Sequence, residues 1–76
     1  MSHMFTLQVS GIDTATDYED QLYRAGCSDA LPAVVNGALY LDFDRDAPSF
    51  EEAVKSARHD VESAGGKVIR VMQTPE

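Results

Sequence analysis

Hydrophobic and polar residues alternate near the start of the chain. Over residues 4–10, MFTLQVS, the apolar side chains of Phe5, Leu7 and Val9 occupy every second position, and polar side chains lie between them. A period of two is typical of a strand that buries one face and exposes the other. The pattern therefore predicts a half-buried strand over residues 4–10.

A second signal is the Asn36-Gly37 pair, which separates two apolar runs. This dipeptide favours a two-residue hairpin of type I′, because both central residues must adopt a positive φ. The pair predicts strands over residues 32–35 and 38–44, with Pro32 opening the first of them. In the second strand, the residues expected to face the core are Leu39, Leu41 and Phe43, and those expected to face outward are Tyr40, Asp42 and Asp44.

Two segments carry helix signals. Thr16 with Glu19, and Ser49 with Glu52, have the spacing of capping boxes. Gly26 follows the first segment at a position suited to a left-handed helix end. In the second segment, apolar residues recur with helical spacing; they are Phe50, Ala53, Val54, Ala57, Val61 and Ala64. The expected helices cover residues 17–25 and 50–64, and Gly65-Gly66 ends the second.

A last strand is predicted over residues 67–73, KVIRVMQ, with Ile69 and Val71 facing inward. The resulting order of elements is βαββαβ. Two β–α–β halves around a central hairpin indicate an α+β domain of the ferredoxin-like split fold over residues 4–74. Its four-stranded antiparallel sheet would carry both helices on one face, with the strand order 4-1-3-2.

Composition and charge narrow the range of partners. The chain has 76 residues, and 13 acidic against six basic residues give a formal net charge of −7. Because phosphate backbones require basic surface, we expect no direct binding of nucleic acid. The single cysteine excludes an intramolecular disulfide and fits a cytoplasmic location. No apolar run approaches the length of a membrane span. Residues 1–3, MSH, resemble the remnant of an expression vector.

The densest group of carboxylates is the alternating set Asp42, Asp44 and Asp46. An EF-hand begins in this way, but it requires glycine at the sixth position and glutamate at the twelfth. Counted from Asp42, these positions hold Ala47 and Ala53. We therefore interpret the aspartates as solvated side chains and expect no specific metal site, although a looser site remains the alternative.

Other residues with reactive side chains stand alone in the sequence. Cys27 follows a helix end and is expected to be a buried structural thiol. His59 falls on the polar side of the second helix, and no nucleophile motif frames any serine. The loop GIDTAT after the first strand lacks the Cys-x-x-Cys of heavy-metal chaperones and the arginine of acylphosphatases. We expect no catalytic residue and no cofactor.

Three segments, YRAGCSDA, NGALYLDFDRDAPSFEEAVKSARHDVESAG and KVIRV, give the chain a family likeness. They resemble the N-terminal ferredoxin-like domain of small bacterial helix-turn-helix regulators, which are often described as DNA-binding or antitoxin-like proteins. The helix-turn-helix would follow residue 73 and is absent from this sequence. The resemblance implies an accessory domain that senses, dimerises or docks, and it implies no catalytic residue.

These observations favour a non-enzymatic interaction or oligomerisation domain associated with bacterial transcriptional regulation. We expect a homodimer, formed either by packing of sheet faces or by pairing of edge strands, with another protein as a possible partner. The alternatives are an ACT-like domain that senses a small molecule near residues 11–14, and an acidic, antitoxin-like inhibitor that masks a basic partner. The surface expected to mediate interaction is the sheet face opposite the helices, with Thr6, Gln8, Tyr40, Val68, Arg70 and Met72.

Overall fold

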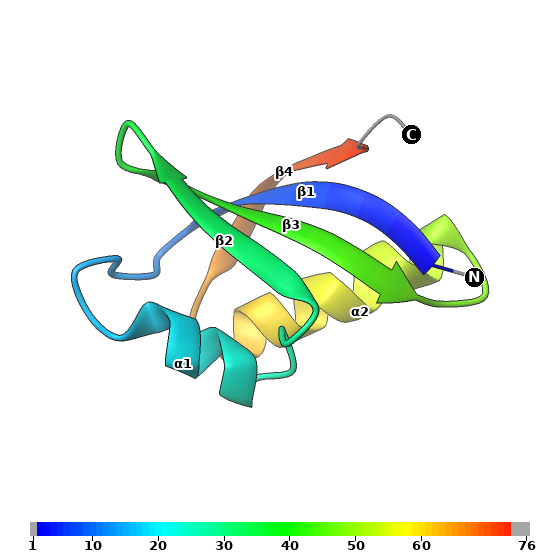
Figure 1. The fold of residues 1–76 in the computed structure, drawn as a ribbon, viewed down its shortest axis with the longest axis horizontal. Coiled ribbons are helices and arrows are strands. Elements are labelled where there is room, and N and C mark those ends of the chain that lie inside the picture. The colour runs from blue at the N-terminus through cyan, green and yellow to red at the C-terminus, as the bar shows by residue number, and fades with distance from the viewer. Residues whose placement is uncertain (1, 74–76) are drawn as a thin grey trace.

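Four strands and two helices follow one another in the order βαββαβ. The computed structural model describes residues 2–73 and has an α+β architecture (Figure 1). The elements are β1 (Ser2–Ser10), α1 (Tyr18–Arg24), β2 (Ala30–Val35), β3 (Ala38–Asp46), α2 (Phe50–Ser63) and β4 (Lys67–Gln73).

All strand pairs in the sheet are antiparallel, in the order β2-β3-β1-β4. β1 and β3 therefore form the centre, and β2 and β4 form the edges. Both helices lie against the same face of the sheet, and α2 runs beneath its central strands (Figure 1). Neither of the two helices found in the described part of the chain covers the opposite face of the sheet (Figure 1).

The core fills the space between the sheet and the helices. β1 and β3 contribute every second residue to it, which confirms the predicted alternation. Phe5 stacks on Phe43 with ring centroids 5.3 Å apart, and Phe50 meets Phe5 edge-on at 5.8 Å. The buried apolar residues are Phe5, Leu7, Val9, Leu22, Cys27, Leu39, Leu41, Phe43, Ala53, Ala57 and Val61.

The β2–β3 hairpin has the predicted turn. Asn36 and Gly37 both adopt positive φ, 52° and 80°, as type I′ geometry requires. β2 begins at Ala30, two residues earlier than expected, because Ala30 pairs with Phe43. Pro32 therefore lies inside the strand and not at its start.

The helix ends match the sequence signals at three of four points. Ser49 Oγ accepts a hydrogen bond from the Glu52 amide at 3.2 Å and caps α2. Both helices end just before the expected glycines. The capping box at Thr16 is wrong, because the Thr16 hydroxyl donates to the Asp13 carbonyl at 2.7 Å and α1 begins after Asp17 without a side-chain cap.

A β-bulge changes the predicted faces of β4. Gln8 is opposite Arg70, but Val9 is opposite Val68, so Ile69 is an extra residue on β4. Val68 and Val71 both pack against the core, whereas Ile69 is exposed. The assignment of Val68 to the outer face, and of Ile69 to the core, was therefore wrong, because a bulge interrupts the period of two.

Ser2 and His3, which resemble a vector remnant, belong to β1. The His3 ring contacts Phe50 edge-on, with centroids 6.3 Å apart. Met1 and Thr74, at the limits of the predicted segments, lie outside the described residues. Within residues 2–73, no helix is long and apolar enough to cross a membrane.

Candidate functional site

The most elaborate polar arrangement in the protein surrounds a buried arginine. Arg45 lies near the end of β3, and only 9% of its surface is exposed. It follows Leu39, Leu41 and Phe43 on the strand face that is directed toward the helices, so alternation directs its side chain inward. A buried guanidinium must be paired and hydrogen-bonded to be tolerated there.

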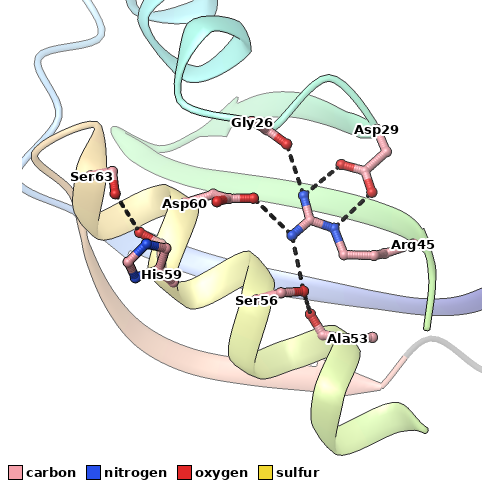
Figure 2. Close-up of polar contacts among 8 residues, drawn as sticks. All are labelled: Gly26, Asp29, Arg45, Ala53, Ser56, His59, Asp60 and Ser63. Carbon is pink, nitrogen blue, oxygen red and sulfur yellow. Dashed lines mark hydrogen bonds and ion pairs between the residues drawn. The ribbon is translucent and has the colours of Figure 1, made fainter. Parts of the chain in front are cut away.

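Arg45 has partners from two separate segments, the connection between α1 and β2 and the helix α2 (Figure 2). Its Nε and Nη2 donate to the two oxygens of Asp29 at 2.8 and 2.9 Å. Its Nη1 donates to Asp60 Oδ2 at 2.9 Å and to Ser56 Oγ at 3.2 Å, and its Nη2 also donates to the Gly26 carbonyl at 2.9 Å. The network therefore joins β3 to the α1–β2 connection and to α2.

The Arg45 network is saturated. A guanidinium has five N–H donors, and the five bonds to Asp29, Asp60, Ser56 and Gly26 use all of them. An incoming anion would have to displace a carboxylate that is already in bidentate contact. This arrangement holds the fold together and leaves no donor for a ligand.

Gly26 lets the α1–β2 connection approach the network closely. Its φ of +107° is in the left-handed region, and a Cβ atom at this position would lie 2.9 Å from Asp60 Oδ2. The Cys27 amide donates to the Leu22 carbonyl at 2.9 Å, which closes the helix end in a Schellman arrangement. The glycine that ends α1 thus also presents its carbonyl to Arg45.

Cys27 lies beside the Arg45 network and is buried, as the sequence predicted. Burial and the nearby carboxylates of Asp60 and Asp29 raise the pKa of its thiol to about 11, against a smaller opposing effect of Arg45. The reactive form of cysteine is the thiolate. Cys27 is therefore poorly suited to nucleophilic chemistry at neutral pH.

We expect native Cys27 to react with iodoacetamide at pH 8 at least about a hundredfold more slowly than in the unfolded chain, because a pKa of about 11 in place of 9.0 lowers the thiolate fraction by that factor. Mass spectrometry of the alkylated chain, with and without denaturant, measures both rates. Equal rates would contradict the burial of Cys27.

The raised pKa of Cys27 also makes stability depend on pH. Since the folded pKa is raised, the stability that the protonated thiol contributes is complete below pH 9.0 and is lost as the pH rises toward 11.

Asp42, Asp44 and Asp46 point outward from β3, as predicted, and do not form a closed ligand set. Asp42 Oδ1 accepts a hydrogen bond from Thr6 Oγ1 at 2.5 Å. Asp44 is opposite Met4 in the register of β1 and β3. Among the residues that the structure describes, no group of three or more His, Cys, Asp or Glu side chains is arranged to hold a metal ion.

The sheet face opposite the helices, here called the open face, contains five of the six residues predicted to mediate interaction. The pairs between β1, β3 and β4 place Thr6 beside Asp42 and Met72, and Gln8 beside Tyr40 and Arg70. Val68 is the exception, as described above. The five residues therefore form one continuous surface across the three strands.

β2 also contributes to the open face, although none of its residues was among the six predicted ones. Leu31 and Ala33 are opposite Asp42 and Tyr40 of β3, so their side chains lie on the same surface. Leu31 is 74% exposed and Val35 is 54% exposed. Leu31 was missed because β2 starts earlier than expected, which places this residue within the strand.

Two further features remain separate from the open face. His59 is on the exposed side of α2, where its carbonyl accepts a hydrogen bond from Ser63 Oγ at 3.0 Å (Figure 2). A shallow hollow between α2 and β4 is lined by Phe50, Val54, Lys55 and other residues. This hollow does not include residues 11–14, where the alternative of an ACT-like domain would place its ligand.

Searches for similar proteins do not identify this chain: no family model, curated protein or solved structure matches it.

Arg45 is the main residue that sequence reasoning missed. Extending the alternation of Leu39, Leu41 and Phe43 by one step would have pointed it inward. The sequence gives no comparable signal for its partners, since Asp29 and Asp60 come from segments 16 positions before it and 15 positions after it.

Proposed function

We propose that this protein is a non-enzymatic interaction domain that forms a homodimer through the open face. The observation that carries the proposal is that no helix or loop of residues 2–73 covers this face (Figure 1), together with its mixed surface of Tyr40, Met72, Leu31 and polar side chains. Aromatic and methionine side chains are enriched at protein interfaces.

The size of the domain supports an interface on this side of the sheet. A chain of 76 residues buries a modest fraction of its surface when it folds alone. Its core occupies one side of the sheet only. Covering the other side with a second copy would bury Tyr40 and Met72, and it needs no residue with a catalytic role.

Two finer assignments belong to the same proposal. The βαββαβ order with antiparallel strands ordered β2-β3-β1-β4 supports a ferredoxin-like fold. The likeness of residues 40–65 to the N-terminal domain of bacterial helix-turn-helix regulators supports a role in transcriptional regulation within the cytoplasm. In that role the domain would bring two regulator chains together.

We expect Tyr40→Ala and Met72→Glu to weaken dimerisation about tenfold or more, because the first removes an aromatic ring from the proposed interface and the second places an unpaired carboxylate in it. Both positions are on the open face, so the variants should fold. Sedimentation velocity over a concentration series gives the dissociation constants. Tyr23→Glu is the matched control, since Tyr23 is 66% exposed on α1.

A dimer that both open-face variants leave as tight as the unaltered chain would contradict the proposal that this face mediates dimerisation. If Tyr23→Glu weakened the dimer to the same extent, the added negative charge would explain the effect. That result would also contradict the proposal.

A further inference from the structure

The two edges of the sheet carry features that disfavour pairing with another strand. Val35 and Ala38 flank a two-residue turn and form a hydrogen-bonded pair, so such pairs alternate along the hairpin. The Asp44 amide donates to the Asp29 carbonyl at 3.3 Å. This pair therefore also falls where the alternation, counted from the turn, predicts a hydrogen-bonded pair. Pro32 therefore belongs to a pair without hydrogen bonds, and its backbone nitrogen points to the free edge of the sheet. Because proline has no N–H, this position offers no donor to an incoming strand.

The other edge is interrupted by the bulge at Ile69. A bulge bends its strand and increases its twist, which is one way in which proteins prevent pairing at an edge. A second copy could extend the sheet only by pairing with one of its two edges. Neither edge offers the regular row of backbone hydrogen-bond donors and acceptors that such pairing requires. The open face remains as the surface on which a second copy can pack.

Charge on the open face is divided between two strands. β3 carries Asp42 and Asp44, and β4 carries Arg70, with β1 between them. Asp42 and Arg70 are in adjacent rows of the sheet, because Asp42 pairs with Thr6 and Arg70 pairs with Gln8. Arg70 makes no ion pair within the described residues.

We propose that two copies pack open face on open face about a two-fold axis that runs along β1, so that Arg70 of each protomer meets Tyr40 and Asp42 of the other. This geometry depends on the proposed function, because it specifies how the homodimer forms. Rotation by 180° about a line along β1 exchanges the strands on its two sides, which are β3 and β4. Positions along the strands are kept, so Arg70 lies over the partner row that contains Tyr40.

Electrostatics selects this axis over the perpendicular one. A two-fold axis in the interface but across the strands would place β3 over β3 and β4 over β4 of the partner. Asp42 and Asp44 would then face a second set of carboxylates, and Arg70 would face another arginine. Along β1, the acidic and basic strands face each other twice, which makes the surface self-complementary, as a two-fold interface requires. The tyrosine ring adds a cation–π contact for Arg70.

The experiment compares Arg70→Asp, Asp42→Arg and the variant carrying both changes, by sedimentation equilibrium. We expect each single change to weaken the dimer about tenfold or more, because it places like charges opposite each other twice. The double variant should return to within about threefold of the unaltered chain, since the exchanged charges again face each other. Arg58→Asp on α2 is the control, with the same change of charge at an exposed site.

Asp42→Arg gives the sharpest result. It lowers the magnitude of the net charge from −7 to −5, because an acid is replaced by a base. General repulsion between two acidic chains therefore predicts a tighter dimer, whereas the proposed contact predicts a weaker one. A dimer that tightens, or that no variant changes, would overturn this geometry while leaving self-association in place. If the unaltered chain were monomeric, that result would instead contradict the proposed function itself.

Discussion

Replacing Arg45 with methionine is expected to lower the free energy of unfolding by about 2–4 kcal/mol. Methionine keeps much of the buried length but donates no hydrogen bond. Asp29 and Asp60 would each lose a charged partner, at side chains that are 30% and 23% exposed. Because both carboxylates retain some contact with water, the expected loss is below that of a fully buried pair. Urea denaturation followed by circular dichroism measures it.

Arg58→Met is the matched control for this variant. Arg58 is exposed on α2, so its replacement should change stability by no more than about 0.5 kcal/mol. If Arg45→Met were equally mild, the network in Figure 2 would not be what joins β3 to α2 and to the connection before β2.

The same network makes a signed prediction about acid. The hydrogen bond from Arg45 is the largest cause that lowers the pKa of Asp29 below 3.8. A carboxylate with a depressed folded pKa contributes stability above its unfolded pKa, and the contribution is lost as the pH falls through the folded pKa. The unaltered chain should therefore lose stability below about pH 4, and Arg45→Met should lose less over that range.

Phe5→Ala is expected to cost about 3–5 kcal/mol, as large truncations of buried aromatic residues do. Phe5 is fully buried, stacks on Phe43 at 5.3 Å and meets Phe50 edge-on at 5.8 Å. Its removal would leave a cavity between the centre of the sheet and the start of α2. Small domains have only about 5–15 kcal/mol of stability, so a large unfolded fraction is expected near 37 °C. Thermal denaturation by calorimetry tests this.

Tyr23→Ala provides a comparison with the same type of truncation. Tyr23 is 66% exposed on α1, and alanine is a better helix former than tyrosine. We expect this control to lie within about 0.5 kcal/mol of the unaltered chain. Similar losses for Phe5→Ala and Tyr23→Ala would contradict the position of the core.

The sequence was most informative where a local pattern determines the structure. Alternation placed Phe5 and Leu41 in the core, and Asn36-Gly37 identified the hairpin, because each depends on backbone geometry within a few residues. The rule of alternation failed at β4, where Val68 and Ile69 are adjacent apolar residues and nothing in the sequence marks the bulge.

The candidate site was predicted in part, for a related reason. Five residues of the open face follow from strand alternation and strand order. The apolar contribution of Leu31 was missed because the start of β2 depends on its pairing with β3. The partners of Arg45 depend on how the helices pack on the sheet, and spacing along the chain does not encode that.

Sedimentation equilibrium of the unaltered protein tests the central claim most directly. The monomer has a mass of 8.3 kDa. We expect the weight-average mass to approach twice this value as the concentration rises to about 100 µM, which is sufficient to populate a dimer of micromolar affinity. A mass that stays at 8.3 kDa up to this concentration would contradict the claim that the open face pairs two copies of the chain.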